Sequence, residues 1–170
     1  MPNREYHVWK DKGTKERKWK SFYEMSIGYK NVFLQSLYDQ ANGQGNYWDE
    51  EILPILFLFS QYLELSFKAL LTKKKISLKT HDIKKLLEEV EKIYPDFKMD
   101  KIRRKLISDT SKMNNRMILD YEGFRYPLKT DGDRIWITTS GKDTFIDLAG
   151  VSTATKDIIG YIDSYFKKLV

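Results

Sequence analysis

The sequence of 170 residues contains no cysteine and only two histidines, His7 and His81. Without cysteine the chain has neither a disulfide nor a thiolate metal site. Because the two histidines are far apart in the sequence, a histidine-based metal centre is also disfavoured. We therefore expect no metal and no cofactor. A chain without cysteine is typical of a reducing cytoplasm, so we expect a cytoplasmic protein.

A long hydrophobic run is also missing. The longest apolar segment, residues 52–59, includes Pro54. A helix that crosses a bilayer needs about 20 apolar residues, and the first residues of the chain are charged, unlike a secretory signal. We expect no membrane association and no signal peptide. The length favours one domain with a full hydrophobic core.

Negative charge is scarcer than positive charge, with 24 acidic and 30 basic residues and a net charge of +6. The excess gathers in residues 1–20 and 73–85. Clustered positive charge favours polyanionic partners, and a solvated lysine-rich surface is the alternative. Trp9 and Trp19 lie within the first cluster. They either stack on bases or pack against the body of the protein, and packing is the favoured interpretation.

Apolar residues that recur every three or four positions predict helices through most of the chain. Residues 1–20 lack this period, so we expect a basic N-terminal arm followed by a helical domain over 21–170. Ser21 and Glu24 form a capping-box pattern at the start of the first helix. The second helix, about 48–74, is apolar on nearly every side in its first half and is therefore expected to be central.

Three further helices are predicted. One begins with Thr80 as its cap and stops at Tyr94-Pro95. The others cover about 100–121 and 152–168. Between these two, residues 124–139 predict a β-hairpin around Asp131-Gly132. The fold class is therefore all-α: an up-and-down antiparallel bundle of about five helices, with a small β-hairpin inserted before the last helix.

Two short motifs carry a family resemblance. Glu64 and Lys68 stand one helical turn apart, and Thr80-His81-Asp82 follows after a loop; Arg125-Tyr126-Pro127 comes later in the chain. Their order resembles the HEPN superfamily (higher eukaryotes and prokaryotes nucleotide-binding). The resemblance implies a HEPN-like helical bundle, frequent dimerisation, and work in RNA cleavage, nucleotide binding or bacterial defence.

The ribonuclease signature of that superfamily is absent from this sequence. Many members are metal-independent ribonucleases that carry an arginine, four to six intervening residues and a histidine. Here Arg4 and His7 have only two residues between them, and no arginine precedes His81 at the required spacing. We therefore expect no catalytic residues.

The expected function is a non-catalytic HEPN-like binding module in a prokaryotic defence or toxin–antitoxin system. Its ligand would be RNA or another nucleic acid, a nucleotide, or a co-encoded protein. One alternative is a divergent metal-independent ribonuclease that uses His81, Arg125 and Tyr126. Another is a structural dimerisation module. The resemblance and the aromatic content of 14% favour a homodimer.

Two sets of candidate site residues follow. The ligand-binding candidates are Glu64, Lys68, His81, Asp82, Arg125 and Tyr126. The nucleic-acid-binding candidates are Lys73, Lys74, Lys75, Arg103, Arg104 and Arg116. Each also has a purely structural interpretation. Glu64 and Lys68 would form an ion pair along the helix, His81 would contact a neighbouring helix, and Asp82 would complement the helix dipole. Tyr126 would pack on the bundle with Arg125 paired to an acid such as Glu122, and the remaining candidates would be solvated charges.

Overall fold

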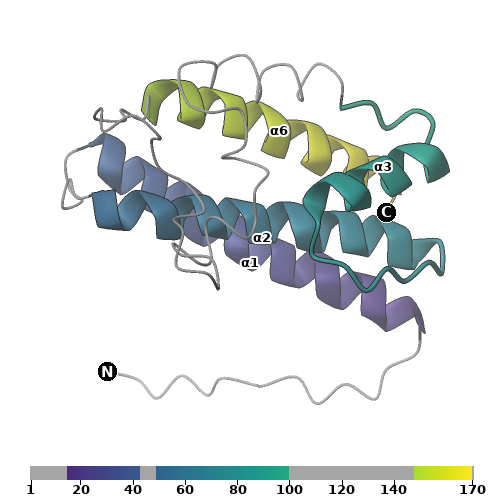
Figure 1. Ribbon diagram of the computed structural model, residues 1–170. Coiled ribbons are helices and arrows are strands. Elements are labelled where there is room, and N and C mark those ends of the chain that lie inside the picture. Colours follow the sequence, from purple (N-terminus) through teal and green to yellow (C-terminus); the bar gives the residue numbers. More distant parts are fainter. Residues whose placement is uncertain (1–14, 43–48, 100–147, 170) are drawn as a thin grey trace, which may run out of the picture.

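The computed structural model describes residues 15–42, 49–99 and 148–169 (Figure 1). These residues form four helices and no strand: α1 Lys15–Ala41, α2 Asp49–Lys73, α3 Ile83–Ile93 and α6 Leu148–Leu169. The expected all-helical architecture is confirmed for this part of the chain. The helix expected at 100–121 and the hairpin expected at 124–139 lie outside the described residues.

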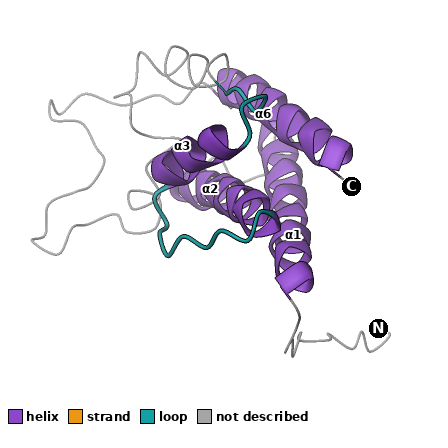
Figure 2. Ribbon diagram, turned by 90° about the vertical axis from the view of Figure 1, so that its right-hand side faces the viewer, coloured by secondary structure: helices purple, strands orange, loops and turns teal. Residues whose placement is uncertain are grey.

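Helix α2 is the centre of the bundle. In the end-on view of Figure 2 it lies between α1 and α3, and α6 lies above α1. Its aromatic and aliphatic side chains, such as Phe59, Leu63 and Leu70, are fully buried or nearly so. The segment Pro54–Lys73 has the length and apolar content of a membrane-spanning helix, but 72% of it is buried inside the protein. That burial is expected of the core helix of a bundle.

Helix α1 begins earlier than the sequence predicts. It starts at Lys15, so the start expected at Ser21 is wrong, and residues 15–20, assigned to the arm, are helical. Burial of Trp19, which is only 8% exposed, gives the additional turn a packing partner. The ammonium of Lys73 lies 4.0 Å from the centre of its ring. The packing interpretation is thus confirmed for Trp19, whereas Trp9 lies outside the described residues.

Helix α2 ends in a hydrogen-bonded reversal of the chain. The Ile76 N–H donates to the Leu71 carbonyl and the Lys75 N–H to the Thr72 carbonyl, the two bonds of a Schellman motif. Lys75 takes the left-handed position with φ 64°, where glycine is the usual residue. The motif turns residues 76–82 back along α2.

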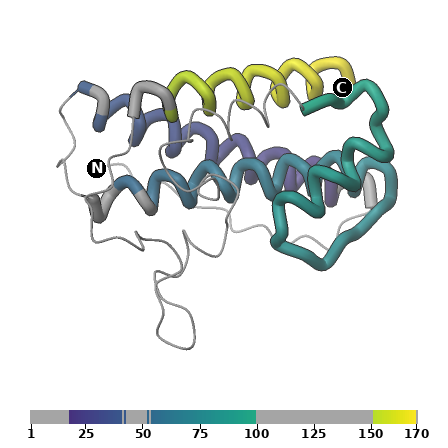
Figure 3. Tube along the Cα trace, turned by 45° about the horizontal axis from the view of Figure 1, so that its top comes forward, coloured from purple at the N-terminus to yellow at the C-terminus, as the bar shows by residue number. Residues whose placement is uncertain are grey.

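This reversal sets the direction of α3. The start of α3 lies beside the middle of α2, where His81 contacts Glu64, and its end lies near the end of α2, where the Tyr94 hydroxyl donates to the Leu70 carbonyl at 3.0 Å. Helices α2 and α3 therefore run in the same sense (Figure 3). The expectation that neighbouring helices are antiparallel is wrong for this pair, because the loop returns before α3 begins.

Asp82, and not Thr80, caps α3. Its carboxylate accepts a hydrogen bond from the Lys85 N–H at 3.1 Å, while the Thr80 hydroxyl accepts one from the Asp82 N–H. Partial burial raises the pKa of Asp82, but the hydrogen bond from the Lys85 N–H and the nearby Lys85 ammonium outweigh it, so the pKa lies below its usual value. The dipole interpretation of Asp82 is consistent with this geometry.

Helix α6 is fastened to the bundle by polar contacts. Asp163 accepts from Lys30 of α1 at 2.7 Å and from the hydroxyl of Tyr62 of α2 at 3.4 Å. The Tyr165 hydroxyl donates to Asp96 at 2.7 Å. These contacts hold α6 against α1, α2 and the segment that follows α3.

Two helix-interior glycines provide a test of these helices. Gly28 of α1 and Gly160 of α6 are exposed, and a Cβ atom at either position meets no atom of the described residues within 4 Å apart from its own helix backbone and chain neighbours. Because glycine costs a helix interior about 0.5–1 kcal/mol relative to alanine, we predict that Gly28→Ala and Gly160→Ala each raise the free energy of unfolding by about that amount. Urea denaturation measures it. A loss of stability in either variant would contradict the open surroundings of that glycine.

The cap of α3 provides a second test. Asp82→Ala is expected to lower the stability by about 0.5–2 kcal/mol because the Lys85 N–H loses its acceptor. Asp82→Asn keeps an acceptor and serves as the matched control at pH 7.

The lowered pKa of Asp82 adds a pH dependence. An acid whose folded pKa is depressed contributes stability above its unfolded pKa, about 3.9, and loses it as the pH falls through the folded value. The wild type should therefore lose this contribution in acid, and the Asp82→Asn variant should lack the change. Equal acid dependence of wild type and variant would show that Asp82 carries no such linkage.

Candidate functional site

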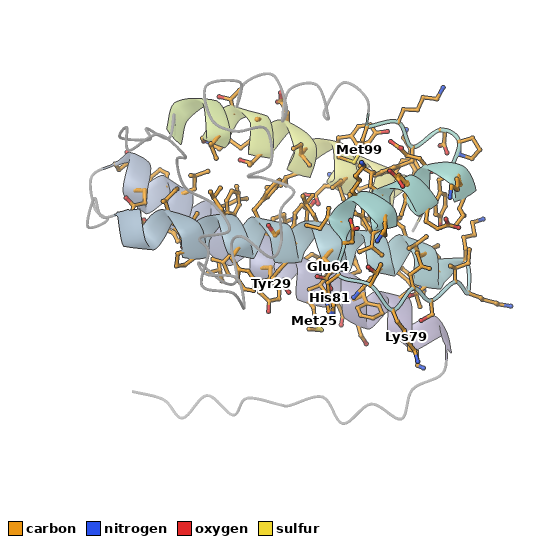
Figure 4. The ribbon with its side chains drawn as sticks, viewed as in Figure 1. Met25, Tyr29, Glu64, Lys79, His81 and Met99 are labelled. Atoms are coloured by element: carbon orange, nitrogen blue, oxygen red, sulfur yellow. The ribbon has the colours of Figure 1, made fainter. Side chains whose placement is uncertain are left out.

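A buried carboxylate joins three of the predicted site residues. The side chain of Glu64, in α2, is only 4% exposed. Its Oε1 atom accepts from the Lys68 ammonium at 2.7 Å and lies 2.9 Å from His81 Nδ1 (Figure 4). An ionised carboxylate oxygen only accepts hydrogen bonds, so a hydrogen bond between these two atoms requires a proton on Nδ1. Both structural interpretations, the ion pair and the contact of His81 with a neighbouring helix, are confirmed as geometry.

The second oxygen of the same carboxylate lacks such hydrogen bonds. Glu64 Oε2 is buried and has no hydrogen-bond partner among the described residues, and Gln61 Nε2, one turn earlier in α2, is in the same state. A buried polar atom without a partner costs about 1–3 kcal/mol. Natural folds concentrate such costs at functional sites, so the imbalance favours a functional interpretation of the cluster.

A pocket of about 300 Å³ opens beside Lys68 and His81. Its polar lining consists of two ammonium groups, one imidazole and three hydroxyls, and its apolar lining comes from α1, α2 and the returning loop. The lining residues are Phe22, Lys68, Leu71, Thr72, Ser77, Leu78, Lys79, Thr80 and His81. The volume lies at the lower end of the range for small-molecule sites.

The lining suits an anion attached to a flat or apolar group. Lys79 is exposed on the loop (Figure 4), and Lys68 and His81 are held in place by Glu64. Lysine ammonium groups and hydroxyls are common donors to phosphate oxygens. The side chains of Phe22, Leu71 and Leu78 give the apolar part of a ligand a surface to contact.

The remaining candidates divide by their position. Asp82 caps α3 and does not line the pocket. Lys73 is engaged in the fold, since its ammonium donates to the Leu169 carbonyl at 2.8 Å. Lys74 and Lys75 are exposed. The other five candidates lie outside the described residues: Arg103, Arg104, Arg116, Arg125 and Tyr126.

Sequence reasoning missed several pocket residues. Lys79 was visible only as a member of the basic run 73–85, and nothing in the sequence singled out Ser77 or Phe22. They meet because the loop turns back along α2 and lies over α1. Glycine is the usual sequence signal of a Schellman motif, and without it the sequence does not predict that the chain turns back here.

Comparison with known proteins adds the family. The family model described as the HEPN domain matches residues 31–144. No curated protein and no solved structure matches the chain. The matched range contains α2, α3, the returning loop and the Glu64–Lys68–His81 cluster. Since it spans more than half of the 170 residues, this protein belongs to the HEPN domain family.

Proposed function

We propose that this HEPN-family protein is a non-catalytic binding module that holds a nucleotide, free or as one unit of a nucleic acid, in the pocket beside Glu64. The observation that carries the proposal is the pairing of a buried carboxylate with Lys68 and His81 at the wall of that pocket. The carboxylate fixes two polar groups that would otherwise sample many rotamers. Preorganised groups bind with a smaller loss of entropy.

The charges around the pocket support a phosphate-bearing ligand. Glu64 and Lys68 neutralise one another, which leaves the Lys79 ammonium as the charged group of the lining that faces an anion. Hydroxyls of Ser77 and Thr80 supply further donors. A nucleobase or ribose would then contact the apolar part of the lining.

The absence of an Arg–His pair at the ribonuclease spacing supports a binding role without catalysis. The family membership also supports the cellular setting that we propose: a cytoplasmic, homodimeric protein of a prokaryotic defence or toxin–antitoxin system. A co-encoded protein is the alternative partner.

The contact between Glu64 and His81 favours one other candidate function. A carboxylate that fixes the imidazole tautomer is the arrangement found where histidine acts as a general acid or base. This supports a divergent metal-independent ribonuclease, in which Arg125 and Tyr126 would complete the site. Binding without cleavage remains the primary proposal because the arginine of the family signature is missing.

Isothermal titration calorimetry tests the binding proposal. We predict that nucleoside 5′-monophosphates bind the wild type and that the matching nucleosides bind at least tenfold more weakly. Lys79→Ala should weaken monophosphate binding about ten- to hundredfold, because a charge-assisted hydrogen bond contributes about 1.5–3 kcal/mol. Lys156→Ala, which removes an exposed lysine of α6 outside the pocket, is the control and should bind normally. Equal binding by the two variants would contradict the proposal.

A cleavage assay separates the two candidate functions. Wild-type protein incubated with single-stranded RNA and a chelator should leave the RNA intact. Cleavage that disappears in a folded His81→Ala variant would replace the binding module with the ribonuclease.

A further inference from the structure

One end of the helical bundle carries a dense group of lysines. The N-terminus of α1 and the C-termini of α2 and α6 meet at the right-hand end in Figure 1, and Figure 3 shows the same ends together. We call these lysines, with the neighbouring one on the loop, the basic end: Lys18, Lys20, Lys73, Lys74, Lys75, Lys79, Lys167 and Lys168. The stretches that hold them, 18–23, 72–80 and 164–169, contain no acidic residue.

Specific contacts join the three helix ends. The Lys73 ammonium donates to the Leu169 carbonyl at the end of α6 and lies over the ring of Trp19 in α1. The Lys20 ammonium lies 5.9 Å from the same ring. Seven of the lysines, all but Lys73, are exposed. The three helix ends therefore lie together and present exposed lysines.

Helix dipoles account for only part of this charge. Each helix C-terminus is equivalent to about half a negative charge and each N-terminus to about half a positive charge. The ends of α2 and α6 favour lysines, but the start of α1 does not, and Lys18 lies in its first turn. Eight lysines exceed the compensation that three helix ends require, and their mutual repulsion opposes folding.

The backbone of Lys75 is independent evidence that a positive charge is present here at a cost in stability. It occupies a left-handed backbone position with φ 64°. Glycine adopts this conformation without strain, whereas a residue with a Cβ atom does not. A lysine at this position makes the fold less stable than glycine would.

The basic end is continuous with the pocket. Lys79 belongs to both, and Phe22 of the pocket lies two residues after Lys20 on α1. The pocket of about 300 Å³ lies at the lower end of the range for small-molecule sites, which suits one nucleotide unit. The bases of a single strand are unpaired and can leave the stack, so one of them can enter a pocket of this kind.

We propose that the basic end binds the phosphate backbone of a single-stranded nucleic acid and leads it to the pocket, an inference that rests on the proposed nucleotide site. Lys18, Lys20, Lys167 and Lys168 lie outside residues 31–144, the range matched by the family model. This surface thus extends beyond the part of the chain that the family defines.

Fluorescence anisotropy with a labelled single-stranded oligonucleotide tests the inference. The test variants are Lys18→Gln/Lys20→Gln and Lys167→Gln/Lys168→Gln. The matched control, Lys84→Gln/Lys156→Gln, makes the same change in net charge at exposed lysines outside the basic end. Each test variant should bind the strand at least fivefold more weakly. Its slope of log affinity against log salt should fall by about 1.4, since each phosphate contact on a single strand contributes about 0.7. The control should behave as the wild type.

The outcomes separate the surface from the pocket. Nucleoside monophosphate binding should be unchanged in both test variants. If monophosphates bind but strand affinity does not depend on these lysines, the inference fails and the pocket stands. If monophosphates do not bind and strand affinity still depends on the lysines, the pocket proposal fails and the surface is supported. Equal loss in the control, equal affinity for a duplex, or preferential binding to phosphatidylserine vesicles would each overturn the inference.

Lys75→Gly separates binding from stability. A structural role for Lys75 predicts a lower melting temperature on substitution. The binding role predicts a higher melting temperature, from relief of backbone strain, together with weaker strand binding and a lower salt slope. A lower melting temperature with unchanged strand affinity would contradict the inference.

Discussion

The arrangement of this protein depends on the buried carboxylate of Glu64. A charge removed from water is costly unless it is paired and hydrogen-bonded. Lys68, one turn along α2, balances the charge, and His81 adds the second contact to the same oxygen. Because His81 belongs to the segment that returns from the end of α2, this contact holds the loop against the helix. The pocket walls contributed by the loop depend on that attachment.

Several unfavourable features of the structure lie around this loop. Glu64 Oε2 has no partner among the described residues, Lys75 has a left-handed backbone, and lysines crowd the adjoining bundle end. Elsewhere α2 is packed by fully buried side chains such as Phe59 and Leu70. A well-packed core thus supports a loop and a bundle end whose residues lower the stability of the fold. Proteins tolerate such local conflicts where binding requires them.

The sequence predicts the core better than the site. Helical spacing places α2 within one residue at each end, because a long apolar period is a strong signal. The start of α1 is not evident from the sequence because Trp19 lies among charged residues, and Trp19 is covered by Lys73, which is distant in the chain. Asp82 was passed over as a cap because Thr80 offers the same chemistry two residues earlier. The contact of His81 with Glu64 spans 17 residues, and its existence depends on the reversal at Lys75, which residue types alone do not reveal.

The tautomer of His81 tests the central claim most directly. In a His7→Gln background, which leaves one histidine, a long-range ¹H–¹⁵N correlation spectrum identifies which ring nitrogen carries the proton. If the Glu64 carboxylate holds the loop, His81 carries its proton on Nδ1, and the Nε2 signal is that of an unprotonated nitrogen. A spectrum with the proton on Nε2 would show that the carboxylate does not accept from this histidine, and would contradict the account of the pocket.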